Sequence, residues 1–492
     1  MENNLRTKAA SSVVWTAVQK YATTAVSFIA GIILARLLTP YDYGCVGMLA
    51  IFITISETFV DAGFGTALIQ KKTPTQTDYS TVFFWNLGMS VVVYAILYFI
   101  SPWVSSFYGI DELCAILRAQ GTIIIINAFS IIQINQLKKN LNFKPWSIIT
   151  LISQIVALII AIIMAYYGFG AWSLVARNLV AAFLTSLILW IYMRWRPLLV
   201  FSWNSFKQLF VFGFYIFLSH LVTRFSVSLQ GLLIGKVYNA NTLGYYTKAD
   251  GFAQLSSRSI SNVLDQVTYP LYAEVQDNKV ALQNMVRRFA MTVSYIMFPL
   301  LFLLILVAEP LFVILYGDKW LPCVPYFQIL CLAGLGQCLQ STNFQTIAAI
   351  GKSKVTFLWT FVKRGFTLAL MVGGLYLWGL KGLLLGAVLN DWIAYFINIL
   401  LVSKYIGYKW WRQLFDIFPV LIVVVIAFFI SYGISGFLNL NLYCDGMLKI
   451  AIFLLLFLGW SFGFKPESYT YTKGILLPYF SHILIRKNHG EA

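Results

Sequence analysis

Charged side chains inside otherwise apolar stretches are the residues of this sequence that could do chemistry. In the stretch 47–69, Glu57 and Asp61 are four residues apart, and in 206–236 His220 and Arg224 have the same spacing. Residues four apart share one face of a helix, so each pair forms a polar stripe. A charge at a bilayer centre costs about 2.5–3.5 kcal/mol on insertion scales, so such stripes predict a paired or functional site.

Further intramembrane charges and their neighbours extend the set. In the stretch 248–272, Gln254, Arg258 and Asp265 advance by helical steps, and Lys20 in 12–38 has a similar polar stripe. The cations outnumber the acids, which favours an anionic guest in a water-filled cavity. The substrate-binding candidates in a central cleft are Lys20, Arg224, Arg258, Arg177, Lys363, Arg364, Trp15, Tyr21 and Gln254. The candidates for ion coupling are Glu57, Asp61, Asp265 and His220.

Structural roles are the alternative for each of these residues. A polar network inside one lobe would also use Arg177, Lys363 and Arg364, and His220 could be a hydrogen-bonded packing residue. Glu57 and Asp61 could equally have a structural role. Trp15 and Tyr21 flank Lys20 closely enough to stack on sugars, although most aromatic residues in membrane proteins belong to interfacial belts and packing.

Composition predicts the class of protein that carries these charges. Of the 492 residues, 60% are hydrophobic and only 11% are charged, with a mean hydropathy of +0.78. A soluble domain carries roughly 25% charged residues. Apolar runs of the length that spans a bilayer recur along the chain. We therefore expect an all-α polytopic membrane protein, and the net charge of +17 follows its loops rather than a nucleic-acid-binding face.

The apolar runs predict about fourteen transmembrane helices. We expect them near 12–38, 47–69, 79–107, 114–137, 148–168, 172–195, 206–236, 248–272, 288–316, 323–350, 354–378, 381–403, 414–436 and 447–464. Basic residues concentrate in the loops on one side, which predicts that both termini are cytoplasmic. The loops are short, so we expect no separate extramembrane catalytic domain.

An internal repeat organises the predicted helices. Arg36 matches Lys236 and Gly44 matches Gly244 at an offset of 200, and Gly168 matches Gly379 further along. Such self-similarity is typical of transporters, whose substrate site usually lies between the halves. We expect two six-helix lobes, 1–200 and 201–405, followed by two C-terminal helices in 406–466 and a cytoplasmic tail in 467–492.

Six cysteines show neither paired nor metal-ligand spacing, and no nucleotide-binding loop or nucleophile motif is present. We therefore expect no metal site, no organic cofactor, no catalytic residues and no covalent step. The protein is predicted not to be an enzyme.

Several motifs carry a resemblance to a known family. They are LARLLTPYDYG at 34–44, DAGFGTALIQ at 61–70, LGYY at 243–246, YPLYAEVQ at 269–276 and YGDKW at 316–320. Together they resemble bacterial polysaccharide exporters of the lipopolysaccharide, O-antigen and colanic-acid type. These exporters belong to the multidrug/oligosaccharidyl-lipid/polysaccharide flippase superfamily.

The resemblance implies alternating access between two lobes and a polyprenyl-pyrophosphate-linked oligosaccharide as cargo. The cargo would move from the cytoplasmic to the periplasmic leaflet of the bacterial inner membrane for surface polysaccharide or exopolysaccharide synthesis. Protons or sodium, and other membrane proteins of polysaccharide assembly, are possible partners. The alternatives are a cation-coupled multidrug or metabolite antiporter of the same superfamily, a membrane glycosyltransferase or polymerase, and a non-transporting assembly partner.

Overall fold

The computed structural model of the chain describes residues 2–438 and 440–474, without the side chains of residues 2–14, 16–18, 258–267, 269–270, 353–354, 356–357 and 361. The described chain is built from helices that follow one another with short connections. They are α1 (Glu2–Leu37), α2 (Pro40–Asp61), α3 (Phe64–Gln70), α4 (Gln76–Tyr108), α5 (Glu112–Lys139), α6 (Phe143–Tyr166), α7 (Ala171–Tyr192), α8 (Trp203–Val237), α9 (Ala240–Glu274), α10 (Lys279–Leu306), α11 (Ala308–Tyr316), the 3-10 turn η1 (Asp318–Trp320), α12 (Cys323–Ala349), α13 (Ser353–Ile406), α14 (Trp410–Phe437) and α15 (Leu442–Phe464).

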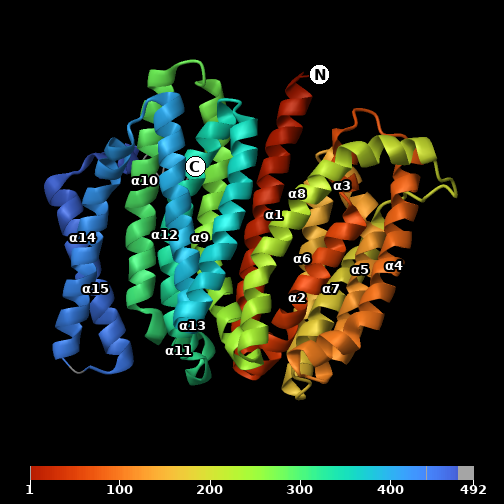
Figure 1. The fold of residues 1–492 in the computed structure, drawn as a ribbon, viewed down its shortest axis with the longest axis horizontal. Helices are drawn as coiled ribbons and strands as arrows, with labels where there is room; N and C mark the ends of the chain where they lie inside the picture. The colour runs from red at the N-terminus through yellow and green to blue at the C-terminus, as the bar shows by residue number, and fades with distance from the viewer. Residues whose placement is uncertain (1, 439, 475–492) are drawn as a thin grey trace, which may run out of the picture. The chain divides into compact units, whose positions relative to one another are not determined.

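These helices form two compact units, Met1–Thr247 (unit 1) and Lys248–Ala492 (unit 2). Unit 1 holds α1 to α8 and the first turns of α9 (Figure 1). The predicted lobe boundary after residue 200 is based on the repeat in the sequence. The two units are defined by packing instead, so they do not test that boundary, which stays a prediction. Of the predicted tail 467–492, the described part ends at residue 474.

Helix α2 is the centre of unit 1 because it packs against α4, α5, α7 and α8. The contact with α8 is extended by α3, where Phe64 lies with its ring centroid 5.5 Å from that of Phe206 and 6.0 Å from that of Phe210. Phe64 is fully buried and Phe206 nearly so. This apolar packing holds α8 against α2 along its length.

The beginnings of α2 and α9 meet through the two glycines that the repeat pairs. A Cβ atom on Gly44 would lie 1.8 Å from the carbonyl oxygen of Ala240, and one on Gly244 would lie 1.8 Å from that of Pro40. Contacts this short leave room only for hydrogen at both positions. The offset of 200 residues in the sequence therefore corresponds to a reciprocal backbone contact within unit 1.

A second glycine pair corrects one detail of the predicted repeat. Gly379 breaks α13 with φ 61° and ψ −142°, and Gly170 before α7 has nearly the same backbone conformation, φ 53° and ψ −130°. Gly168, which the sequence comparison paired with Gly379, has φ 82°. A positive φ with ψ near −140° is accessible mainly to glycine, so local conformation pairs Gly379 with Gly170.

The predicted fold class, an all-α polytopic membrane protein, is confirmed. Within the described residues, twelve helices are long and apolar enough to cross a membrane, and the longest of them, Leu358–Ile406, contains the break at Gly379. The long helices follow the fourteen predicted spans in order. Several boundaries were wrong. Helices α1, α9 and α10 begin at Glu2, Ala240 and Lys279, eight to ten residues before their predicted starts. The predicted span 47–69 is divided between α2 and α3, and 288–316 is divided between α10 and α11.

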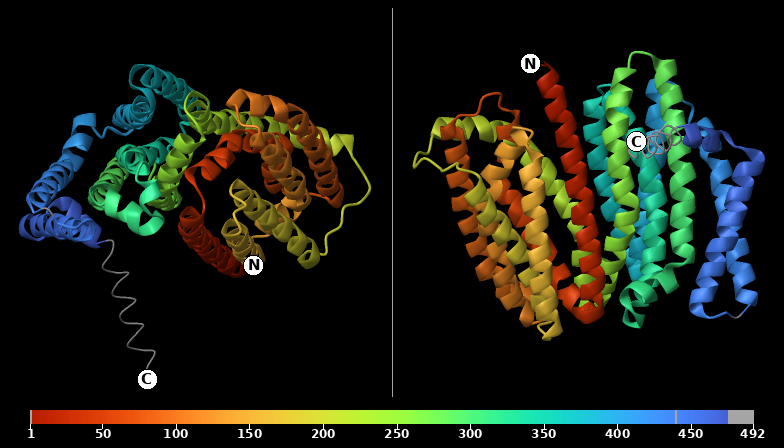
Figure 2. Two further views of the ribbon diagram at one scale, coloured as in Figure 1. Left: turned by 90° about the horizontal axis from the view of Figure 1, so that it is seen from below. Right: turned by 180° about the vertical axis from the view of Figure 1, so that it is seen from behind.

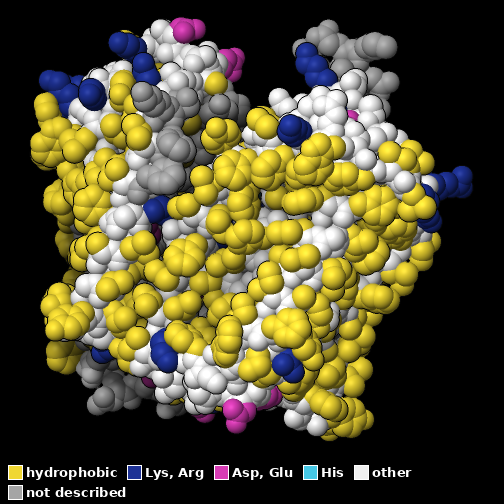
Figure 3. Space-filling model, turned by 45° about the vertical axis from the view of Figure 1, so that its right-hand side comes forward, with side chains coloured by type: hydrophobic (Ala, Val, Ile, Leu, Met, Phe, Trp, Pro, Cys, Tyr) yellow, Lys and Arg dark blue, Asp and Glu magenta, His cyan; other side chains and the backbone are white. Residues whose placement is uncertain are grey.

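The surface also has the character of a membrane protein. Large apolar side chains such as Phe99, Ile191 and Leu455 are 76%, 73% and 72% exposed. In Figure 3 hydrophobic side chains cover most of the visible face, while charged ones gather mainly near its upper and lower ends. Such a surface would be poorly soluble in water and is suited to lipid.

An ion-pair network within unit 2 joins its last two helices to α10. Helix α14 packs against α10 and forms a hairpin with α15 (Figure 2). From α10, Arg287 donates two hydrogen bonds to the Asp416 carboxylate on α14, at 2.9 and 2.8 Å, and one to Glu467 after α15, at 2.7 Å. Tyr408 also donates to Asp416. Bidentate guanidinium–carboxylate pairs are among the strongest side-chain contacts.

Replacing Arg287 by alanine is expected to loosen the docking of α14 and α15. Asp416 is only 13% exposed and would lose its cationic partner, so the free energy of unfolding should fall by about 3 kcal/mol. The measurement is thermal unfolding of the purified protein in detergent. Lys279→Ala is the control because Lys279 is an exposed cation at the start of the same helix. Equal stability of the two variants would contradict an anchoring role for Arg287.

Candidate functional site

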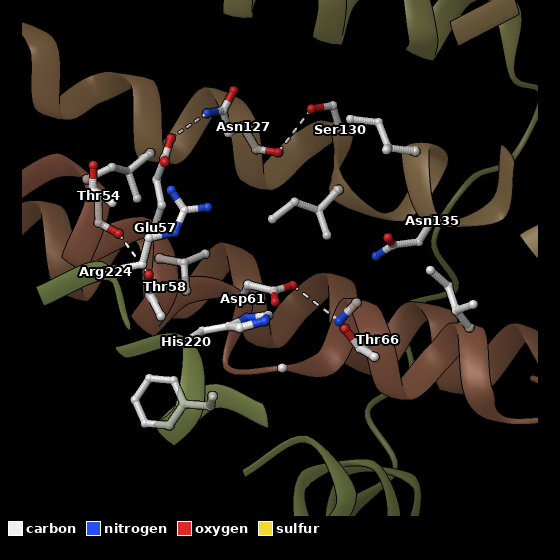
Figure 4. Close-up of a pocket in the computed structure, with 18 of the residues that line it drawn as sticks. Thr54, Glu57, Thr58, Asp61, Thr66, Asn127, Ser130, Asn135, His220 and Arg224 are labelled. Atoms are coloured by element: carbon white, nitrogen blue, oxygen red, sulfur yellow. Dashed lines mark hydrogen bonds between the residues drawn. The ribbon is translucent and has the colours of Figure 1, made fainter. Parts of the chain in front are cut away.

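Two polar stripes from neighbouring helices face each other in unit 1. On α2 the stripe is Glu57 and Asp61, and on α8 it is Arg224 and His220 (Figure 4). Glu57 lies in the electrostatic field of Arg224, and Asp61 lies in that of His220 and of Lys138 from α5. The two i,i+4 stripes predicted from the sequence therefore come together on facing helices.

These side chains line one cavity of about 540 Å³. Helices α2, α3, α5 and α8 supply its walls. Its polar lining residues are Thr54, Glu57, Thr58, Asp61, Thr66, Asn127, Ser130, Asn135, Lys138, His220 and Arg224. A cavity of this size matches the range of small-ligand sites, which begins at roughly 300 Å³.

The backbone of α2 places its two carboxylates. The helix ends at Asp61 because Ala62 and Gly63 adopt left-handed conformations, with φ 44° and 78°. The chain then turns into α3, and the Asp61 carboxylate accepts a hydrogen bond from the backbone N–H of Gly65 at 3.2 Å. One turn earlier, the Glu57 carboxylate accepts from the Asn127 amide of α5 at 3.0 Å. Both carboxylates are thus fixed while they remain half-buried.

Helix α5 completes the site with a third polar stripe. Asn127, Asn135 and Lys138 line the cavity from this helix. Asn135 is 7% exposed, and its Nδ2 group has no hydrogen-bond partner within the described residues. A buried amide donor without a partner costs roughly 1–3 kcal/mol, so it indicates an acceptor that enters from the cavity. The oxygen of a sugar or a phosphate has that chemistry.

The charges of the site balance closely. The lining contains two carboxylates, Glu57 and Asp61, and three basic side chains, Lys138, His220 and Arg224. Hydroxyl and amide groups surround these charges. Arginine binds phosphate oxygens in bidentate fashion and lysine binds them as a point charge. The cavity can therefore hold a hydrated anion with hydroxyl groups, provided that the carboxylates release their cations.

Comparison with known proteins identifies the family. Residues 33–325, more than half of the chain, match the family described as "Polysaccharide biosynthesis protein". The chain belongs to this family. The predicted resemblance to polysaccharide exporters of the flippase superfamily is confirmed.

Several named proteins are similar to the chain over most of their length. The chain is 24% identical to the teichuronic acid biosynthesis protein TuaB of Bacillus subtilis, over 70% of this chain and 72% of that protein. It is 23% identical to the succinoglycan biosynthesis transport protein ExoT of Rhizobium meliloti, over 80% and 78%. It is 22% identical to the lipopolysaccharide biosynthesis protein WzxC of Escherichia coli, over 85% and 87%.

Solved structures show the fold of this family member. The lipid II flippase MurJ in an inward closed conformation matches with a TM-score of 0.76 at 15% identity, covering 92% of this chain and 99% of that chain. An inward-facing multidrug resistance MATE transporter matches with a TM-score of 0.59 at 16% identity, covering 80% and 98%. The chain has the fold that these two proteins share.

Other candidates in unit 1 lie outside the cavity lining. Lys20 and Tyr21 are on α1, and Tyr21 is 54% exposed. The ring of Trp15 lies 5.3 Å from the Lys144 ammonium of α6. Arg177, on α7, is half-buried and close enough to Tyr43 of α2 to interact electrostatically. The predicted substrate contacts of these residues stay predictions.

Unit 2 holds the remaining candidates. Lys363 of α13 donates to the Gln340 side chain of α12 at 2.8 Å and lies near Asp391, and Arg364 follows it in α13. In α9, Gln254 donates to Asp250 at 2.5 Å. Arg258 and Asp265 are also in α9, but their side chains lie outside the described residues. Lys363 therefore takes part in a network between helices of one unit.

Sequence reasoning missed the contribution of α5. The concentration of basic residues in the loops of one side accounts for Lys138 without a role in a site, and the asparagines Asn127 and Asn135 carry no charge that would mark them as candidates. The signal was present, because Asn135 follows Asn127 by eight residues, about two helical turns, and Lys138 follows three residues later, so the three share one helix face. A search for uncharged polar residues at helical spacing would have found this stripe.

Proposed function

We propose that the protein is a flippase that moves a polyprenyl-pyrophosphate-linked oligosaccharide from the cytoplasmic to the periplasmic leaflet of the bacterial inner membrane. Both termini would be cytoplasmic, and the two halves of the repeat would alternate in access. The protein would act as a transporter and not as an enzyme. The observation that carries the proposal is the cavity in unit 1, where Arg224, Lys138 and the unpartnered Asn135 amide converge.

The chemistry of the cavity fits the head group of such a lipid. A pyrophosphate diester carries two negative charges, and the basic side chains of Arg224 and Lys138 can contact both phosphates. The threonine and asparagine side chains offer hydrogen bonds to sugar hydroxyl groups. The names of related proteins support this assignment, since WzxC is named for lipopolysaccharide biosynthesis, ExoT for succinoglycan transport and MurJ as a lipid II flippase.

A cation-coupled antiporter remains the competing function. Its cavity would be dominated by acids that accept a cationic drug or metabolite. Here the carboxylates of Glu57 and Asp61 are matched by Arg224 and Lys138, which would repel such a cargo. The balance of charges therefore favours an anionic cargo.

Replacing Arg224 by glutamine is expected to reduce export of the surface polysaccharide by about 10- to 100-fold, because one hydrogen bond to a charged group contributes roughly 1.5–3 kcal/mol. Lipid-linked oligosaccharide should accumulate on the cytoplasmic side. The measurement uses a strain that lacks the native gene and carries each variant, with membrane levels of the protein determined in parallel. Lys20→Gln and Arg258→Gln test the other predicted contacts in the same assay.

Arg194→Gln is the matched control, because Arg194 is an exposed arginine of unit 1 in the segment between α7 and α8. It should export normally. Normal export by Arg224→Gln and by Lys138→Gln, at normal protein levels, would contradict an anion site in this cavity. Loss of drug resistance with unchanged export would favour the antiporter.

A further inference from the structure

The carboxylates of the cavity lie in the electrostatic field of the same cations that an anionic cargo would need. Glu57 faces Arg224, and Asp61 faces His220 and Lys138. These five are the titratable groups of its lining, since α3 contributes only uncharged residues and the other helices packed on α2 contribute none to that lining. An entering phosphate would therefore compete with a carboxylate for each cation.

Coulomb repulsion between the phosphate and the two carboxylates makes binding of the anion unfavourable unless a carboxylate is neutralised. Both carboxylates are half-buried, where charges are screened less than in bulk water. A dianion placed in this cavity would bring the number of negative charges in it to four, against the positive charges of Arg224 and Lys138. Protonation of a carboxylate removes one of these negative charges. The neutral Glu57 side chain can still accept the hydrogen bond from Asn127.

We propose that Glu57 and Asp61 are internal counter-ions that an anionic head group displaces, and that they take up protons when it binds. The proposal rests on the function proposed above and adds the coupling of cargo binding to proton uptake. Each proton comes from water and converts a carboxylate to a carboxylic acid. Arg224, Lys138 and His220 are then available to the phosphate oxygens.

The sign of the pH dependence follows from linkage. The complex with the anion holds more protons than the free protein, so binding tightens as pH falls and weakens as pH rises. One proton taken up per anion changes the dissociation constant by about tenfold per pH unit. Glu57→Gln removes one group that takes up protons and leaves an amide oxygen for Asn127.

The test uses the purified full-length protein in detergent with UDP-glucose as the probe. This probe is a pyrophosphate diester attached to a sugar, and its phosphates do not titrate near neutral pH. Calorimetry in two buffers of different ionisation enthalpy measures both affinity and the number of protons taken up. Glucose serves as the uncharged control ligand. Asp111→Asn is the control variant, since Asp111 is an exposed carboxylate of unit 1 outside the cavity lining.

We expect the wild type and Asp111→Asn to take up protons on binding UDP-glucose. Glu57→Gln should bind it more tightly at neutral pH and take up fewer protons, and Asp61→Asn is a second variant with the same expected direction. Binding without proton uptake, or uptake that neither variant reduces, would overturn the coupling and leave the proposed function standing. Failure of the wild type to bind UDP-glucose would count against the anion site itself, and so against both.

Discussion

Alanine at Gly44 or Gly244 is expected to lower the free energy of unfolding by about 2 kcal/mol. Each added Cβ would lie 1.8 Å from a carbonyl oxygen, of Ala240 in one case and of Pro40 in the other. These are backbone atoms, which cannot rotate away as a side chain would. Overpacking costs typically about 1–3 kcal/mol or more, and the better helix propensity of alanine returns about 1 kcal/mol. The measurement is thermal unfolding in detergent.

Two other helical glycines provide the control for this prediction. A Cβ on Gly88 of α4 or on Gly251 of α9 would meet nothing within 4 Å. Alanine at these positions should be neutral or slightly stabilising, because it favours a helix more than glycine does. If Gly44→Ala and Gly244→Ala were as stable as these controls, the close approach of α2 and α9 would not contribute to stability.

The sequence indicates the contact between α2 and α9 because the internal repeat pairs the two glycines that form it. The offset of 200 pairs Gly44 with Gly244, and long apolar runs set the order of the spans. The glycine of the first half that corresponds to Gly379 was harder to predict. Gly168 and Gly170 lie only two residues apart, and it is their backbone angles that distinguish them. The order of the helices follows directly from the order of the apolar runs. It could therefore be predicted without knowledge of tertiary contacts.

The candidate site was predictable only in part. Spacing of four residues identified the stripes of α2 and α8, but periodicity does not reveal which stripes meet. Lys20 had the same pattern on α1 and does not line the cavity, whereas Lys138 does. The rule that basic residues gather in cytoplasmic loops already accounts for Lys138. Its position near Asp61 results from the packing of α2 against α5, which the sequence does not reveal. The periodicity of one helix shows which residues share a face, but it does not predict which other helix that face contacts.

Replacing Arg224 by glutamate is expected to abolish export, with a fall of at least about 100-fold. The substitution removes a cation and places a third carboxylate beside Glu57 and Asp61. Juxtaposed like charges cost several kcal/mol, and about 1.4 kcal/mol corresponds to a tenfold change. Export of surface polysaccharide and the membrane level of the variant are measured together, because repulsion between α2 and α8 should also lower stability.

A double-mutant cycle separates pairing from binding at this position. If Arg224 only neutralised Glu57, then Glu57→Gln combined with Arg224→Gln would restore both stability and export, because removing both partners of an ion pair is often nearly neutral. We expect stability to return while export stays at least about tenfold below wild type, since the cation that contacts the phosphate is still missing. Recovery of export in the double variant would show that Arg224 only neutralises Glu57 and does not bind the cargo.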